Sequence, residues 1–324
     1  MIYTLTLNPA VDRELTVPAV EFDAVLRASE SQVDFGGKGF NVSRLLKSLV
    51  AASTSVGFLG GRSGELLQAG LGQLGIGTDF VWVGGETRTN ISIVTETHNH
   101  YIKVNEKGPL VEADKQEELL AKIDAITRPG DWWVLAGSLP PRVGDDFYAR
   151  IVQVLNRHLA KAVLDTTCES LRLGCAEHPF LVKPNVEEAQ ALTGLPMDMV
   201  HPEQIAAAAA AIRAMGAQNV VISMGKGGAL LQTVTGTWLI STPKVQEKNP
   251  IGAGDSMVGG LVWALTQGHS LKESMGWGIA SGAATASQGG TEVGSRTLIE
   301  SLVPHVTFTT ICIPFMNGEA SHGV

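Results

Sequence analysis

The chain of 324 residues is long enough for about two domains, or for one large α/β domain with an appendage, which is the arrangement that we expect. Apolar residues make up 44% of the sequence and charged residues 17%, a composition typical of a folded protein and not of a disordered one. The formal net charge of -8 argues against a nucleic-acid or anionic membrane partner, although a small anion needs only local positive groups.

The cysteines and the N-terminus indicate a cytoplasmic protein. Three cysteines without a C-x-x-C pair fit reduced thiols better than a disulfide framework or a zinc site. The N-terminus has no basic segment before an apolar core, and no apolar run reaches the roughly 18 residues of a membrane span.

The first predicted elements are a strand and a helix. A β-rich run at residues 2–7 ends at the turn signal Asn8-Pro9. Directly after the stretch FGGKGFN, helical spacing appears at Val42, Leu45, Leu46 and Leu49.

The middle and C-terminal parts of the chain alternate between strands and helices. Strands are expected at 131–138, 160–167, 180–185 and 219–225, and helices at 145–159, 186–194 and 202–217. This alternation is typical of a parallel sheet with helices packed against it, and the ligands of such sheets lie at the carboxyl ends of the strands.

Two stretches interrupt the alternation, at residues 10–35 and about 85–112, and they lack a helical period. They could form a small β-layer or long loops, and we favour the β-layer because long structureless loops are uncommon in compact domains. We therefore expect one α/β domain over residues 1–310 with this β-layer attached, and a loosely ordered tail at 311–324.

The segment GLGQLG, residues 70–75, matches the dinucleotide-binding pattern G-x-G-x-x-G. It follows an apparent helix and precedes a strand, whereas a dinucleotide loop needs a strand first and a helix after it. These glycines are better interpreted as the end of a helix.

The segment GGKG, residues 36–39, places Gly36, Gly37, Lys38 and Asn41 at the entrance of a helix. Free backbone N–H groups and the positive end of the helix dipole favour an anion there. The segment is not a Walker A loop, since no Ser or Thr follows the lysine. A helix-entry turn that simply needs glycine is the alternative.

The segment GAGDS begins another helix. Its small residues leave the N–H groups of Ala253, Gly254 and Asp255 open to an anionic ligand such as a phosphoryl group. The motif alone leaves Asp255 as a catalytic base or as a helix cap. A hydrolase built on Ser256 is a third interpretation, but no aspartate follows Asp255 to orient a histidine.

Seven segments now stand in order over residues 1 to about 300: LTLNPAVD, GGKGFNVSRLL, GETRTNISI, LAGSLPP, VKPNVEEA, VVISMGKGGALL and IGAGDSMVGGLV. This ordered set resembles the ribokinase-like sugar kinases of the phosphofructokinase-B family. The resemblance implies a twisted, mostly parallel sheet with helices on both faces. It also implies a small β-sheet lid over the sugar, which commonly forms a homodimer contact.

The resemblance further implies transfer of the γ-phosphoryl group of ATP, with Mg²⁺, to a hydroxyl of a sugar phosphate. Fructose 1-phosphate is the first candidate acceptor and tagatose 6-phosphate the second, with another hexose or hexose phosphate third. Potassium activates parts of the family and is a further candidate cofactor. A Gly-Asp-Ser esterase that ignores ATP, or a silent sugar-binding member of the fold, would be the rival functions.

Carried onto this chain, the family motifs make Asp255 the base, with the backbone from Gly252 through Ala253 and Gly254 as the anion hole. The helix start would hold Asp255 ionised and therefore only modestly basic. The expected sugar-side residues are Asp12, Gly37, Lys38, Asn41, Arg88, Ser138 and Arg27. Arg88 and Arg27, then Lys38, are the candidates for the sugar's own phosphate, because guanidinium groups bind phosphate at two points.

On the nucleotide side, the resemblance points to Lys183, Asn185, Ser223, Gly225 and Gly228. Glu188 would act on magnesium through water, since magnesium keeps several of its waters. An acidic residue in the first turn of a helix is the plainer interpretation of Glu188. Residues 278–287 resemble the small-residue helix that packs under an adenine.

Overall fold

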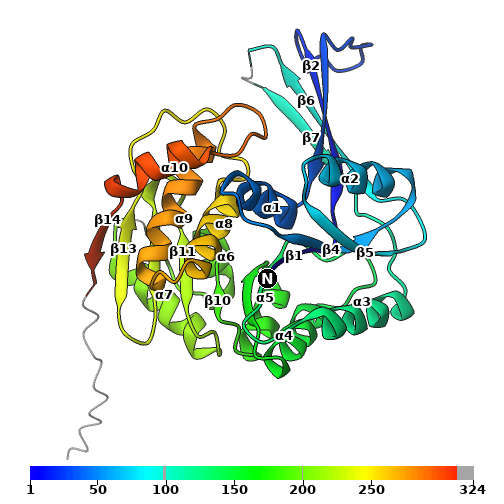
Figure 1. Cartoon of the computed structure of the whole chain (residues 1–324). Coiled ribbons are helices and arrows are strands. Elements are labelled where there is room, and N and C mark those ends of the chain that lie inside the picture. The colour runs from blue at the N-terminus through cyan, green and yellow to red at the C-terminus, as the bar shows by residue number, and fades with distance from the viewer. Residues whose placement is uncertain (98–99, 199, 312–324) are drawn as a thin grey trace, which may run out of the picture.

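A large sheet forms the centre of the computed structural model, which describes residues 1–97, 100–198 and 200–311 (Figure 1). Within these ranges ten strands form this sheet in the order β14 (Thr307–Thr310), β13 (Thr237–Ser241), β12 (Ala229–Gln232), β11 (Val220–Ser223), β10 (Leu181–Val182), β9 (Lys161–Asp165), β8 (Trp132–Ala136), β1 (Ile2–Thr6), β4 (Thr54–Leu59) and β5 (Gly77–Trp82). Neighbouring strands are parallel from β5 to β11 and antiparallel from β11 to β14. The predicted, mostly parallel α/β sheet is confirmed.

Helices cover both faces of this sheet and enclose two large hydrophobic cores, and a third, smaller cluster contains Val11, Phe40 and Leu67. One core lies under α1 (Lys38–Ser48), α8 (Ala253–Thr266), α9 (Leu271–Ala286) and α10 (Arg296–Leu302). The other lies under α3 (Ala113–Ile126), α4 (Phe147–Arg157), α5 (Cys168–Ala176), α6 (Val186–Thr193) and α7 (Pro202–Ala214). Strand β8 contributes Trp133 and Leu135 to the second core and Trp132 and Val134 to the first. A strand buried on both faces must be apolar throughout, as the run WWVLA is.

Four strands form a second, smaller sheet that projects from the large one (Figure 1). In the described residues its order is β3 (Glu30–Gly36), β2 (Ala10–Val17), β6 (Arg88–Thr95) and β7 (Tyr101–Asn105). Strands β2 and β6 are parallel, and the other two pairs are antiparallel. The β-layer expected from residues 10–35 and 85–112 is thus confirmed. We call it the small sheet.

Several local expectations can be compared with the structure. Helix α2 (Gly61–Gln73) runs into GLGQLG, so these glycines do end a helix and precede β5. Strand β10 is shorter than the expected 180–185, because Pro184 has no N–H to continue a ladder. Two short 3-10 helices, η1 (Gly225–Gly227) and η2 (Val303–His305), complete the elements of the described chain.

The C-terminal end of the described chain contains a strand that the sequence did not predict. Strand β14 pairs antiparallel with β13 and extends the large sheet. Apart from Ile311, the tail expected at 311–324 lies outside the described residues. Among the described residues, no helix has both the length and the apolar character needed to cross a membrane.

Candidate active site

Asp255 lies in the first turn of α8, at the end of the glycine-rich segment. Gly252 is the N-cap of α8, and its φ of +77° is in the left-handed region that favours glycine. The Asp255 residue is only 8% exposed. Burial, together with the nearby Asp165 carboxylate, raises its pKa to about 6. Burial therefore makes Asp255 more basic than the helix start alone would predict, while a pKa of about 6 still leaves it mainly ionised at neutral pH.

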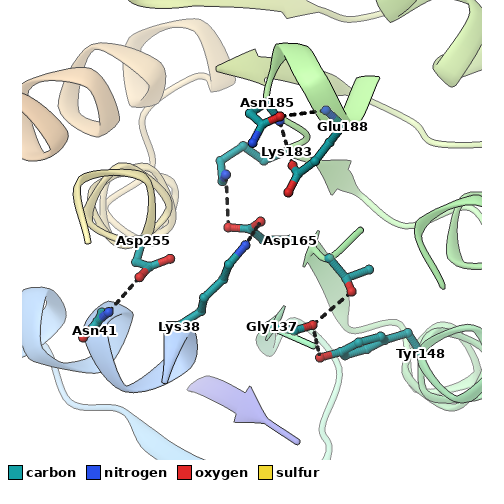
Figure 2. Close-up of polar contacts among 10 residues, drawn as sticks. Lys38, Asn41, Gly137, Tyr148, Asp165, Lys183, Asn185, Glu188 and Asp255 are labelled. Atoms are coloured by element: carbon teal, nitrogen blue, oxygen red, sulfur yellow. Dashed lines mark hydrogen bonds and ion pairs between the residues drawn. The ribbon is translucent and has the colours of Figure 1, made fainter. Parts of the chain in front are cut away.

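Asn41 connects the starts of two helices. It lies in the first turn of α1, and its Nδ2 donates a hydrogen bond to Oδ2 of Asp255 at 2.8 Å (Figure 2). A Cβ on Gly252 would lie 3.7 Å from the same nitrogen, so the two helix starts are close neighbours. The two glycine-rich segments GGKG and GAGD, far apart in the sequence, thus meet at one place.

Asp165, at the end of β9, is the central charge of the site. Its carboxylate is 1% exposed and pairs with Nζ of Lys38 at 2.9 Å and with Nζ of Lys183 at 3.1 Å (Figure 2). Burial disfavours the charged form, but the two lysines hold the pKa of Asp165 below its ordinary value. Two carboxylates, Asp165 and Asp255, and two ammonium groups are therefore gathered between α1, α8, β9 and the segment that follows β10.

The backbone at the start of α8 provides hydrogen-bond donors beside this cluster. Within the described chain, the N–H groups of Gly254 and Asp255 have no hydrogen-bond acceptor. The Ala253 N–H was also expected to be open, but it donates to the Pro250 carbonyl at 3.2 Å, because the chain turns tightly before the helix. A Cβ on Gly254 would lie 3.7 Å from Nζ of Lys183, so an ammonium group borders these donors.

A cavity of about 1430 Å³ opens next to the start of α8. Its floor includes small and apolar residues of α9, and its walls come from α6, η1 and the segment after β13. It is large enough for a nucleotide. The lining includes these residues named from the sequence: Asn185, Ser223, Gly225, Gly228, Ala253, Gly254, Ile279, Gly282, Ala283 and Ala286.

Asn185 and Glu188 form a capping box at the start of α6. The Asn185 side chain accepts from the Glu188 N–H at 2.7 Å, and Oε2 of Glu188 accepts from the Asn185 N–H at 2.9 Å (Figure 2). Glu188 also contributes to raising the pKa of Lys38, so its charge faces the cluster. Among the described residues, no group of three or more His, Cys, Asp and Glu side chains is placed so that it could hold a metal ion. One or two carboxylates fit Mg²⁺, which takes few protein ligands when it accompanies phosphates.

The small sheet carries two of the residues that the sequence analysis expected on the sugar side, Asp12 and Arg88. Asp12 on β2 lies opposite Asn90 on β6, and Nδ2 of Asn90 donates to Oδ1 of Asp12 at 2.7 Å. Burial raises the pKa of Asp12. A Cβ on Gly36 would lie 2.2 Å from the Asp12 carboxylate, so only glycine leaves room for it. Two residues before Asn90, Arg88 donates to the carbonyl groups of Glu106 and Asn8, each at 3.0 Å.

The model of the pfkB family of carbohydrate kinases matches residues 5–298. The chain belongs to this family. The kinase is 34% identical to 1-phosphofructokinase of Bacillus subtilis over 311 residues, which cover 96% of this chain and 100% of the relative. It is also 34% identical to D-tagatose-1-phosphate kinase of Bacillus licheniformis, over 88% of this chain and 92% of that protein.

Solved structures give the same result for the fold. Phosphofructokinase-2 from Escherichia coli, in complex with potassium, superposes with a TM-score of 0.88 at 29% identity, covering 94% of this chain and 98% of that one. A tetrameric inhibited form of that enzyme has a TM-score of 0.86 at 28% identity, with the same coverage. The predicted ribokinase-like fold and the predicted carbohydrate kinase are both confirmed.

The structure of this kinase does not bring all the predicted residues together. Arg27 lies in the loop between β2 and β3, is exposed, and has no ion pair in the described part of the chain. Ser256, the nucleophile of the rival hydrolase, is completely buried and accepts a hydrogen bond from the Thr285 hydroxyl at 2.8 Å. No histidine among the described residues contacts it, so it has no base to activate it.

Three polar residues of the site were missed by the sequence analysis. Asp165 ends an otherwise apolar strand, and a polar residue at that position could have indicated it. Asn90 lies two residues after Arg88 in GETRTNISI, so strand alternation could have placed it on the same face of the small sheet as Arg88. The third is Asp34 on β3, which pairs with Arg44 of α1 and so fastens the small sheet to the large domain. Burial would raise the pKa of Asp34, but Arg44 holds it below its usual range.

Proposed function

We propose that this kinase transfers the γ-phosphoryl group of ATP to a hydroxyl of a sugar phosphate, with fructose 1-phosphate as the first candidate acceptor and tagatose 6-phosphate as the second. The observation that carries the proposal is the position of Asp255. It is a buried carboxylate of raised pKa in the first turn of α8, and its neighbours Ala253 and Gly254 line a cavity of nucleotide size. The relatives named 1-phosphofructokinase and tagatose-6-phosphate kinase favour these two acceptors.

In the proposed reaction, Asp255 accepts the proton of the acceptor hydroxyl. Asn41 occupies Oδ2 of the carboxylate, which leaves Oδ1 available to the hydroxyl. The hydroxyl oxygen forms a bond to the γ-phosphorus while the bond from that phosphorus to the leaving ADP oxygen breaks. Because this transfer has a loose transition state, positioning and charge neutralisation matter more than a strong base.

Charge neutralisation would come from groups that already lie beside Asp255. The N–H groups of Gly254 and Asp255 and the ammonium groups of Lys38 and Lys183 are donors for the phosphoryl oxygens. Glu188 would hold Mg²⁺ through water, and the metal would neutralise phosphate charge. Potassium belongs in the assay buffer, because E. coli phosphofructokinase-2 was solved in complex with it.

We also propose that the small sheet covers the sugar and forms a homodimer contact with its outer face. Strand alternation places apolar residues opposite one another on that face, with Leu15 beside Ile93 and Ile91 beside Val104. Ile91 and Val104 are exposed by 37% and 57% in the single chain. Ile91→Glu should give a monomer in sedimentation velocity if the contact exists, whereas an unchanged sedimentation coefficient would contradict it.

The function is tested by a coupled assay of ADP release over a panel of sugars and sugar phosphates. We expect turnover on fructose 1-phosphate and a decrease in kcat of about 10² to 10⁴ for Asp255→Asn, with the Kd for ATP little changed. Ser256→Ala is the matched control, because it removes only the hydroxyl of the neighbouring side chain. No turnover on any phosphosugar would exclude the substrate class, and retained turnover in Asp255→Asn would exclude the base.

A further inference from the structure

Two buried hydroxyl groups hold one carbonyl at the edge of the site. The carbonyl oxygen of Gly137, in the turn after β8, accepts hydrogen bonds from the Tyr148 hydroxyl and from Oγ1 of Thr166, each at 3.0 Å (Figure 2). Tyr148 is completely buried and Thr166 is 2% exposed. Burial also raises the pKa of Tyr148, so its hydroxyl keeps its proton and remains a donor. Both lone pairs of the carbonyl are therefore occupied by protein groups.

The orientation of this carbonyl fixes the next N–H group. The peptide bond between Gly137 and Ser138 is trans, as are all the peptide bonds of the described chain. In a planar trans peptide, the C=O and the following N–H point in opposite directions. The Ser138 N–H must therefore point away from Tyr148 and Thr166. It has no hydrogen-bond acceptor within the described part of the protein.

The same turn is attached to the charged cluster. The Gly137 N–H donates to the Asp165 carbonyl at 3.0 Å, and Thr166 is the next residue along the chain. The φ of Gly137 is +103°, a conformation that side chains other than glycine rarely adopt. In Figure 2, the carbonyl oxygen of Gly137 faces Tyr148, while Lys38, Asn41 and Asp255 lie on the other side of Gly137.

We propose that Tyr148 and Thr166 are positioning residues, which aim the Ser138 backbone N–H at an oxygen of the acceptor sugar. This inference rests on the proposed kinase function and adds a donor to its sugar subsite. This free N–H lies at the carboxyl end of β8, in the turn whose Gly137 N–H binds the Asp165 carbonyl, and ligands of such sheets lie at the carboxyl ends of the strands. The two hydroxyls prevent the peptide from turning its carbonyl oxygen toward the electron-rich substrate.

Because two hydroxyls bind one carbonyl, the loss of either one leaves the other in place. We therefore expect Tyr148→Phe and Thr166→Val alone to have small effects, and the double variant to have an effect larger than their sum. The double variant should raise the KM for fructose 1-phosphate about tenfold, the effect of one lost hydrogen bond, and leave the KM for ATP unchanged. The pair Tyr148→Phe with Thr166→Ser keeps one hydroxyl and should restore the wild-type KM.

A matched control removes the same kinds of group elsewhere. The Tyr3 hydroxyl donates to the Ile126 carbonyl at 3.5 Å, and Oγ1 of Thr127 donates to the Ile123 carbonyl at 2.6 Å, both at the end of α3. Tyr3→Phe with Thr127→Val should lower the melting temperature without changing either KM. Equal KM values for fructose 1-phosphate in the wild type and the Tyr148→Phe, Thr166→Val variant would overturn the proposal, as would a parallel increase in both KM values.

The outcome can be separated from failure of the proposed function. The wild-type rate on fructose 1-phosphate tests the function by itself. If the wild type acts on a different sugar of the panel, the same variants are measured with that sugar, and its KM must still increase relative to that of ATP. A double variant that denatures before assay is replaced by Tyr148→Phe with Thr166→Ala, for which the same KM criterion applies.

Discussion

Nδ2 of Asn41 donates a hydrogen bond to Oδ2 of Asp255 at 2.8 Å, and this contact joins two helix starts that are 214 residues apart in sequence. The amide stabilises the charged form of the carboxylate and opposes the effect of burial on its pKa. It also fixes the plane of the carboxylate. Asn41 therefore contacts the proposed base, and its contact with the sugar remains a prediction.

Asn41→Ala should reduce kcat about tenfold and raise the apparent pKa of the base, because one hydrogen bond to a charged group is lost. The pH profiles of kcat and of kcat/KM for the variant and the wild type measure both effects. Asn156→Ala is the control, since the amide of Asn156 donates to the Glu177 carbonyl on the surface. A lower kcat with an unmoved acid limb would mean that Asn41 does not contact the ionising carboxylate.

The raised pKa of Asp255 predicts the pH dependence of the reaction. A base must be ionised to accept a proton, and burial raises the pKa of Asp255 to about 6. We therefore expect kcat/KM to be constant above about pH 7 and to decrease tenfold per pH unit below about pH 5. A profile that is flat from neutral pH down to about pH 4.5 would contradict this pKa.

The same pKa also predicts how stability depends on pH. The pKa of Asp255 is raised from 3.8 to about 6 on folding, so the folded state binds the proton more tightly. The resulting stabilisation is complete below about pH 4 and is lost as pH increases through about 6, which amounts to about 3 kcal/mol. Asp255→Asn cannot ionise and should gain that amount relative to the wild type between about pH 4 and pH 7. Urea unfolding across this range measures the difference, and a difference independent of pH would refute the prediction.

Asp165→Asn should destabilise the fold by about 3 kcal/mol, because it leaves the buried Lys183 without a counter-ion. The side chain of Lys183 is 7% exposed, whereas that of Lys38 is 37% exposed and can reach water. Asp124→Asn is the matched control, since Asp124 pairs with Arg157 and His158 at the surface and should contribute little. The denaturant midpoints of unfolding of the two variants test this prediction, and we expect the lower midpoint for Asp165→Asn. Equal midpoints would show that Asp165 is not a structural counter-ion.

Arg88→Ala should raise the KM for fructose 1-phosphate about 10- to 100-fold, the usual range for a hydrogen bond to a charged group, with the KM for ATP unchanged. Two nitrogens of the Arg88 guanidinium donate hydrogen bonds to backbone carbonyls, and its Nε is buried without a hydrogen-bond partner in the described chain. Arg142→Ala is the control, as Arg142 pairs with Glu112 at the surface. Steady-state kinetics at saturating co-substrate separates the two KM values, and equal increases in both would count against a phosphate contact.

The sequence predicted the elements whose signals are local. The apolar run of β8 and the helical spacing of α1 and α4 each depend on neighbouring residues, and the structure has them in place. Strand β14 escaped prediction because its pattern TFTT is short and mostly exposed. Its strand conformation depends on hydrogen bonds to β13, and no local sequence pattern reveals this pairing.

The candidate site was predictable to the extent that glycine-rich motifs mark backbone donors. Asp255 and Lys38 lie in such motifs, but Asp165 lies at the end of an ordinary apolar strand and gains its role only from two lysines that reach it from other segments. Similarly, the increase in the pKa of Asp255 follows from burial in the folded chain, which the helix-start signal cannot report.

The four strands of the small sheet come from only two segments of the chain, one between β1 and α1 and the other between β5 and α3. No strand pairing of the described residues joins it to the large sheet. The Asp34–Arg44 ion pair and the hydrophobic cluster of Val11 and Phe35 with Phe40, Leu67 and Leu71 of α1 and α2 hold the two together. Protein engineering could therefore replace the small sheet with that of a relative. Residues 10–36 and 88–105 of a relative could be transplanted together, and the hydrogen-bond ladder beneath would keep all ten strands. New sugar acceptors could be sought in this kinase by such a graft, provided that the side chains at Val11 and Phe35, which pack against α1 and α2, are kept.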